Sequence, residues 1–115
     1  MTIAANLLSG KHCVPCEGGV PVLDKDQVRQ YLSGLAAWQV NESNTEISKE
    51  FNFKNYYQVM AFVNAVAFIA HQDKHHPDLS VHYNRVVIRY STHAIGGLSE
   101  NDFICAAKVD RLNEF

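Results

Sequence analysis

The sequence predicts an α+β fold: a four-stranded antiparallel sheet with three helices packed on one face, in the order α-β-β-α-β-β-α. Two observations predict it. Segments whose apolar residues recur at helical spacing are interleaved with segments in which apolar and polar residues alternate. The predicted strands come in two consecutive pairs, each flanked by helices, which favours two hairpins in one sheet. A chain of 115 residues is long enough for one core, so we expect a single domain.

Residues 1–22 are rich in proline and glycine and show no periodicity, so they are predicted to form a poorly structured leader. The leader carries a CxxC pattern formed by Cys13 and Cys16. It could be half of a zinc site or a redox pair, but no second CxxC accompanies it, and we expect a reduced pair without a function. The total of three cysteines argues against a disulfide framework. Cys105 lies among apolar residues and is expected in the core.

The domain is predicted over residues 23–115, and its first elements are a helix and two strands. Asp24 or Asp26 is expected to cap a helix that continues to about Leu35. Residues 38–40 are predicted to form a short strand. Residues 45–53 alternate between a mostly apolar face and a polar face, which predicts a half-buried strand.

The second half of the domain contains the clearest helix, predicted over residues 55–75 from its wide apolar face. This helix must end by about His75, because Pro77 disfavours helical geometry at the residue before it. Strands are expected near residues 79–83 and 86–92. The last helix is predicted to begin after Ser99, which can act as its N-cap, with Asp102 completing a capping box.

Composition limits the classes of protein to which the chain can belong. Hydrophobic residues make up 47% and charged residues 19%, as is usual for a globular protein. The net charge is −2 and the pI is near 6.3, so the basic patch of a nucleic-acid binder is missing. The longest apolar stretch ends at His71 and is too short to span a membrane. With no signal peptide at its start, the chain is expected to be cytoplasmic, without nucleic-acid or membrane partners.

Histidines are the most informative residues, because five of the six fall between residues 71 and 93. Histidine can give or take a proton near neutral pH. His71 and His75 are expected one turn apart on one face of the middle helix. His93 follows a predicted strand, and Asp102 lies in the first turn of the last helix. Strand ends and helix ends can converge in an α+β fold, so one pocket could contain these side chains.

The spacing of these residues resembles that of the pterin-4a-carbinolamine dehydratase family. The similar string is His71-x3-His75-His76-Pro77-x5-Tyr83-x9-His93-x8-Asp102, together with Ser91-Thr92-His93 and Gly97-Leu98-Ser99. The resemblance covers the chain from residue 24 to its end, including the predicted order of elements. Two positions depart from the usual family pattern. His71 stands where many members have an acidic residue, and Leu79 stands where many have a tryptophan.

The resemblance implies a lyase that dehydrates 4a-hydroxytetrahydrobiopterin to quinonoid dihydropterin, the recycling step after aromatic amino acid hydroxylation. It implies no metal, no organic cofactor, a functional link to an aromatic amino acid hydroxylase, and a homodimer or homotetramer. By this resemblance the catalytic residues are His75, His76, His93 and Asp102. The residues expected to bind the pterin are His76, Pro77, Ser91 and Thr92. Within the site, acid–base roles fall to His75 and His93, and Asp102 would orient one imidazole.

Two alternatives to this hypothesis remain open. A zinc enzyme could use His71 and His75, which have the i,i+4 spacing of zinc ligands, although the glutamate of an HExxH motif is absent. A non-enzymatic binding module is the second alternative, since animal members of the family also act as dimerisation partners of a transcription factor. Fold alone does not separate an enzyme from a binding protein on one scaffold.

Overall fold

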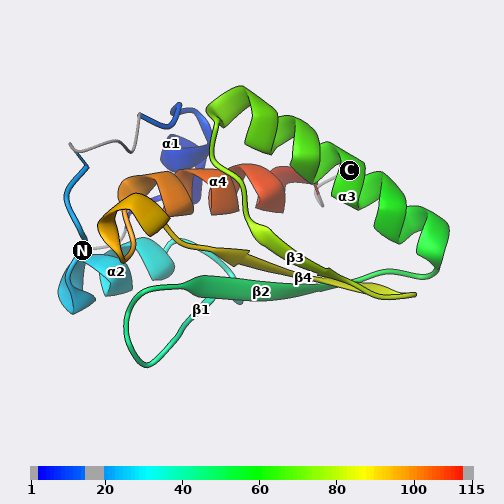
Figure 1. Ribbon diagram of the computed structural model, residues 1–115, viewed down its shortest axis with the longest axis horizontal. Helices are drawn as coiled ribbons and strands as arrows, with labels where there is room; N and C mark the ends of the chain where they lie inside the picture. Colours follow the sequence, from blue (N-terminus) through cyan, green and yellow to red (C-terminus); the bar gives the residue numbers. More distant parts are fainter. Residues whose placement is uncertain (1–2, 15–19, 113–115) are drawn as a thin grey trace.

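A computed structural model describes residues 3–14 and 20–112, and it has the predicted α+β architecture (Figure 1). Its four strands form one antiparallel sheet in the order β1-β2-β4-β3. The strands are β1 (Gln39–Val40), β2 (Ile47–Asn52), β3 (Asp78–Val81) and β4 (Arg85–Tyr90). The helices are α1 (Ala5–Ser9), α2 (Lys25–Leu32), α3 (Tyr56–Asp73), the 3-10 helix η1 (His93–Ile95) and α4 (Glu100–Arg111). From α2 onward the predicted element order is confirmed, and η1 is an addition.

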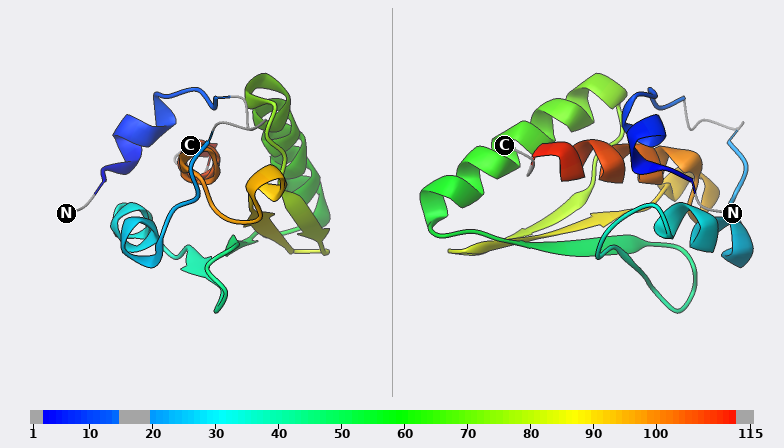
Figure 2. Two further views of the ribbon diagram at one scale, coloured as in Figure 1. Left: turned by 60° about the vertical axis from the view of Figure 1, so that its left-hand side comes forward. Right: turned by 180° about the vertical axis from the view of Figure 1, so that it is seen from behind.

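The core lies between the sheet and the helices α3 and α4, which cross the same face of the sheet (Figures 1 and 2). In the central β2–β4 pair, Ile47 is opposite Tyr90 and Phe51 is opposite Val86, and all four side chains are buried. Lys49 lies on the same face of β2, because side chains alternate along a strand. Its ammonium reaches Asp110 on α4 at 2.8 Å, so the one charged residue on this face of β2 is paired.

The helix caps follow the sequence closely. The Asp24 carboxylate accepts the backbone N–H of Gln27 at 2.8 Å and begins α2, as predicted. Ser99 caps α4 and Asp102 completes the predicted capping box. The helix α2 ends at Leu32, short of the expected Leu35, and a turn through Ser33 follows it.

Within the predicted leader, residues 3–14 contain a short helix that the sequence did not predict. This segment contains α1, whose Leu8 is fully buried and whose contacts are with α4. The leader also runs against the turn after α2, where a Cβ atom on Gly34 would collide with the carbonyl oxygen of Ile3. Tertiary contacts therefore order a segment that is too short to show periodicity. Cys16, the second cysteine of the CxxC pattern, lies outside the described residues.

Candidate active site

The site begins where α3 ends. Lys74 adopts a left-handed conformation (φ 52°, ψ 40°), and the backbone N–H groups of Lys74 and His75 both donate to the carbonyl of Ala70. This geometry terminates the helix and reverses the chain direction. The expectation that His71 and His75 share one helical face is therefore wrong. His71 remains on α3 and is exposed, whereas His75 is outside the helix and only 7% exposed.

His75 is bound to Asp102 across the core. Its Nε2 lies 2.6 Å from the Oδ1 of Asp102, and that carboxylate is fully buried. The imidazole also stacks on the ring of Tyr90, with centroids 5.9 Å apart and planes 9° from parallel. The end of α3, the end of β4 and the start of α4 thus fix the position of one ring.

Asp102 is held from its other oxygen as well. Its Oδ2 accepts the hydroxyl proton of Thr92 at 2.8 Å and the backbone N–H of Ser99 at 3.0 Å. An ionised carboxylate can only accept hydrogen bonds, so His75 donates to it through Nε2–H. In the neutral ring the lone pair is then on Nδ1. The arrangement selects one tautomer of His75, which is what a defined acid–base group requires.

Thr92 contributes to this network through its hydroxyl group. The side chain is 1% exposed and lies between Asp102 and the hydroxyl of Ser99, whose oxygen is 2.8 Å away. Because Thr92 donates its single hydroxyl proton to Asp102, the Ser99 hydroxyl donates to Thr92. The hydroxyl of Thr92 is thus engaged with protein groups, and Thr92 also lines the hollow that contains His93.

The histidines line two separate hollows. His75 and His76 share a hollow of about 410 Å³ with His71, Lys74 and Ala70. His93, the first residue of η1, lines a second hollow of about 280 Å³ with residues that include Ser91 and Glu46. The Asp102–Thr92 contact links the two hollows, since Asp102 binds His75 and Thr92 immediately precedes His93.

Sequence reasoning missed two residues that border these hollows. Lys74 directly precedes the His-His-Pro sequence, but only its left-handed backbone turns the chain so that it lines the same hollow. Glu46 comes from the connection between β1 and β2, and no motif marks it. Pro77 follows the two histidines in the sequence. It is half-buried and lines neither hollow.

Tyr90 adds an unusual polar atom beneath His75. Its hydroxyl is buried, and no hydrogen-bond partner exists for it within residues 3–14 and 20–112. Burial raises the pKa of Tyr90 far above its ordinary value, and nearby acidic groups, Cys105 first among them, raise it further. Tyr90 therefore remains neutral and provides an aromatic platform for His75.

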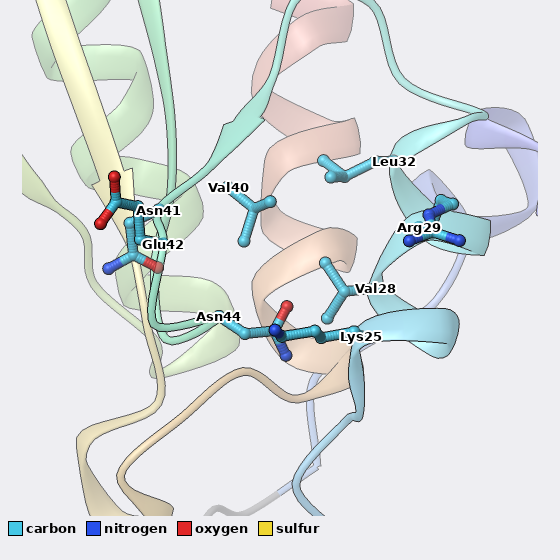
Figure 3. Close-up of a pocket in the computed structure, with 8 residues that line it drawn as sticks. All are labelled: Lys25, Val28, Arg29, Leu32, Val40, Asn41, Glu42 and Asn44. Carbon is cyan, nitrogen blue, oxygen red and sulfur yellow. The ribbon is translucent and has the colours of Figure 1, made fainter.

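A third hollow, of about 190 Å³, lies away from the histidines between α2 and the β1–β2 connection (Figure 3). Val28 and Leu32 of α2 face Val40 of β1 across it. Polar groups stand at its margin, among them Lys25 and Asn44. It contains no residue of the histidine cluster and so is not part of the candidate site.

Within the described part of the chain, no group of three or more histidine, cysteine, aspartate and glutamate side chains is arranged to hold a metal ion. None of the helices in that part combines the length and the apolar character needed to cross a membrane.

Comparison with known proteins identifies the fold and its relatives. A protein of Nitrosospira multiformis, provisionally named a pterin-4-alpha-carbinolamine dehydratase, is 57% identical over 105 residues, covering 91% of each chain. A protein of Nitrosomonas eutropha with the same provisional name is 58% identical over 106 residues, covering 91% of this chain and 92% of the relative.

Two solved structures are also similar. The transcriptional coactivator/pterin dehydratase of Brucella melitensis matches with a TM-score of 0.77 and 28% identity, over 80% of this chain and 98% of that one. A pterin dehydratase-like protein described as a RuBisCO assembly factor of the alpha-carboxysome matches with a TM-score of 0.58 and 26% identity. That match covers 68% of this chain and 90% of the other.

The α+β fold, its histidine cluster and these relatives together define the class of protein, a hydro-lyase. The family model described as pterin 4 alpha carbinolamine dehydratase matches residues 21–112. This chain belongs to that family.

Proposed function

We propose that this protein dehydrates 4a-hydroxytetrahydrobiopterin to quinonoid dihydropterin by histidine acid–base catalysis, without a metal. The observation that carries the proposal is the buried His75–Asp102 pair, 2.6 Å apart, beside a hollow that His76 also lines. Family membership supplies the substrate class. The volume of the hollow, about 410 Å³, is within the range of small-molecule sites.

The chemistry of this reaction suits imidazoles. The 4a hydroxyl is a poor leaving group until an acid protonates its oxygen, after which the carbon–oxygen bond breaks and water leaves. A proton on a ring nitrogen must be removed as the new double bond forms. An acid and a base of this kind each contribute roughly 10²–10⁴-fold to the rate.

The residues take different roles in this proposal. His75, whose tautomer is set by Asp102, exchanges a proton with the substrate, and His93 is the second acid–base group. His76 is exposed in the same hollow as His75 and contacts the pterin, together with the adjacent Pro77. Ser91 contacts the pterin from the hollow that contains His93. Thr92 is assigned as a positioning residue, because its hydroxyl holds Asp102.

A coupled assay tests the proposal. A phenylalanine hydroxylase generates the carbinolamine, and the purified protein should speed its disappearance above the spontaneous rate. The acceleration should be lost in His76→Ala and His93→Ala and kept in His82→Ala, since His82 is exposed at the β3–β4 turn and lines neither hollow. Full activity in folded His76→Ala and His93→Ala proteins would refute the assigned site.

A binding module without catalytic activity is the second candidate. The specific observation in its favour is that one structural relative is described as a RuBisCO assembly factor and another as a transcriptional coactivator. The assembly factor covers less of this chain, with a lower TM-score, than the pterin dehydratase of Brucella melitensis. A folded protein that gives no acceleration yet binds a partner tightly would favour this candidate.

Association into a homodimer or homotetramer belongs to the same proposal. The helix α3 leaves three aromatic side chains exposed, Tyr57 at 83%, Phe68 at 62% and Tyr56 at 50%. Large apolar groups gathered on one helix are typical of an interface between subunits. Light scattering should give a mass of two or four chains, and a monomer at micromolar concentration would contradict it. A cytoplasmic location and a functional link to an aromatic amino acid hydroxylase complete the proposal.

A further inference from the structure

Two cysteines that are distant in sequence meet behind the candidate site. The sulfur atoms of Cys13 and Cys105 are 3.5 Å apart, although the residues are separated by 92 positions. Cys105 is fully buried on α4, and Cys13 is half-buried within the leader. Both are free thiols.

Cys13 is fixed in position by other contacts. Its backbone N–H donates to the Oδ1 of Asp73 at 3.1 Å, and its thiol lies 3.6 Å from the carbonyl oxygen of Asn101. Asp73 is itself bound to Lys108 of α4 at 2.7 Å. The segment that carries Cys13 is therefore anchored to both α3 and α4, and the two thiols are held within reach of each other.

We propose that Cys13 and Cys105 form a redox-active pair that closes to a disulfide when the protein meets a peroxide. Cys13 is the attacking thiol because it is the one partly open to solvent. Its sulfur forms a bond to one peroxide oxygen as the oxygen–oxygen bond breaks, which gives a sulfenic acid and one water. The sulfur of Cys105 then attacks that of Cys13, the sulfur–oxygen bond breaks, and the oxygen leaves with the Cys105 proton as a second water.

The order of these steps agrees with the surroundings of Cys105. The hydrogen bond with Cys13, burial, and the nearby carboxylates of Asp73 and Asp102 raise the pKa of the Cys105 thiol, so it resists ionisation and first attack. Once Cys13 is oxidised, Cys105 needs only to close a gap of 3.5 Å. Its role is that of the resolving cysteine.

The disulfide would clamp the leader onto α4. A cross-link between residues 92 positions apart removes much of the freedom of the unfolded chain, so the oxidised protein should melt at a higher temperature. It would also alter the surroundings of the site, because the Cys105 thiol lies 4.0 Å from the backbone carbonyl of His75 as a weak donor, and oxidation removes that proton.

The test separates this pair from the CxxC pattern. In the full-length Cys16→Ser protein, treatment with hydrogen peroxide should remove the mass of two hydrogen atoms and link the peptides that contain Cys13 and Cys105. The melting temperature should rise by several degrees and return on reduction. Neither change should occur in the Cys16→Ser/Cys105→Ser protein, which has the same leader but no resolving cysteine.

Three results would overturn the proposal. One is that both thiols of peroxide-treated Cys16→Ser protein still react with a maleimide after denaturation. Another is oxidation of Cys13 to a sulfinic acid, or to a link between two chains, without a bond to Cys105. The third is obtained on the unmutated protein, where peptide mapping that finds Cys13 bonded to Cys16 would assign the oxidised state to the CxxC pattern.

Discussion

Asp102→Asn is the substitution that separates the orientation of His75 from the packing of α4. The asparagine carbonyl oxygen can replace Oδ2 and accept the Thr92 hydroxyl and the Ser99 backbone N–H, so the cap of α4 is kept. The amide NH₂ then replaces Oδ1, 2.6 Å from the Nε2 of His75. Two donors cannot bond to each other, and His75 must move its proton to Nδ1.

The two consequences differ in size. Loss of one hydrogen bond to a charged group should lower the free energy of unfolding by about 1.5–3 kcal/mol. The wrong tautomer of His75 should lower kcat roughly 10²–10⁴-fold, equivalent to about 2.7–5.4 kcal/mol of barrier. Activity is measured by carbinolamine disappearance, and stability by urea unfolding.

Asp110→Asn provides the matched control on the same helix. Asp110 accepts bonds from Lys49 at 2.8 Å and from the Trp38 indole at 3.0 Å, away from the histidines. This control should lose a similar amount of stability and keep its kcat. A folded Asp102→Asn protein with the kcat of the unmutated protein would refute the reasoning that Asp102 sets the state of His75.

Three further predictions follow from single contacts. Tyr90→Phe removes a buried hydroxyl that has no partner in the described structure, so urea unfolding should show a gain of about 1–3 kcal/mol; a loss would mean that the hydroxyl has a partner such as a buried water. Burial acts to raise the pKa of Asp73, but the bonds from Lys108 and the Cys13 backbone outweigh it and lower the pKa below 3.8. The stability that Asp73 gains from ionisation is therefore present above that pH and is lost as pH falls through the lowered pKa. The difference in free energy of unfolding between the unmutated and Asp73→Asn proteins, measured by urea unfolding, should therefore shrink in acid. An undiminished difference would contradict this. His71→Ala, which changes an exposed wall of the His75 hollow, should raise KM a few-fold and leave kcat unchanged in steady-state kinetics, and a large loss of kcat would place His71 in the chemistry.

Local signals in the sequence predicted the fold well. The strand β2 and the caps at Asp24 and Ser99 depend on neighbouring residues, and such signals can be read without knowledge of the tertiary structure. The helix α1 was missed because its order comes from the burial of Leu8 against α4, a contact between distant parts of the chain.

The sequence could nominate residues for the candidate site, but it could not predict their geometry. Spacing marked His75 and Asp102, but it could not show that Lys74 takes a left-handed conformation and turns His75 into the core. The pairing of Cys13 with Cys105 was invisible for the same reason, since the sequence suggested Cys16 as the partner. Contacts between distant residues depend on how the helices and strands pack, and local patterns in a single sequence do not predict them.

Asp102 performs two tasks with one carboxylate, since it closes the capping box at the start of α4 and holds the ring of His75. Residues that serve catalysis often lower the stability of the folded state, so activity and stability commonly oppose each other. Here one carboxylate caps the first turn of the last helix and orients His75, the acid–base group of the proposed mechanism. In the proposed mechanism, selection for activity and selection for a well-folded chain therefore act on this position in the same direction.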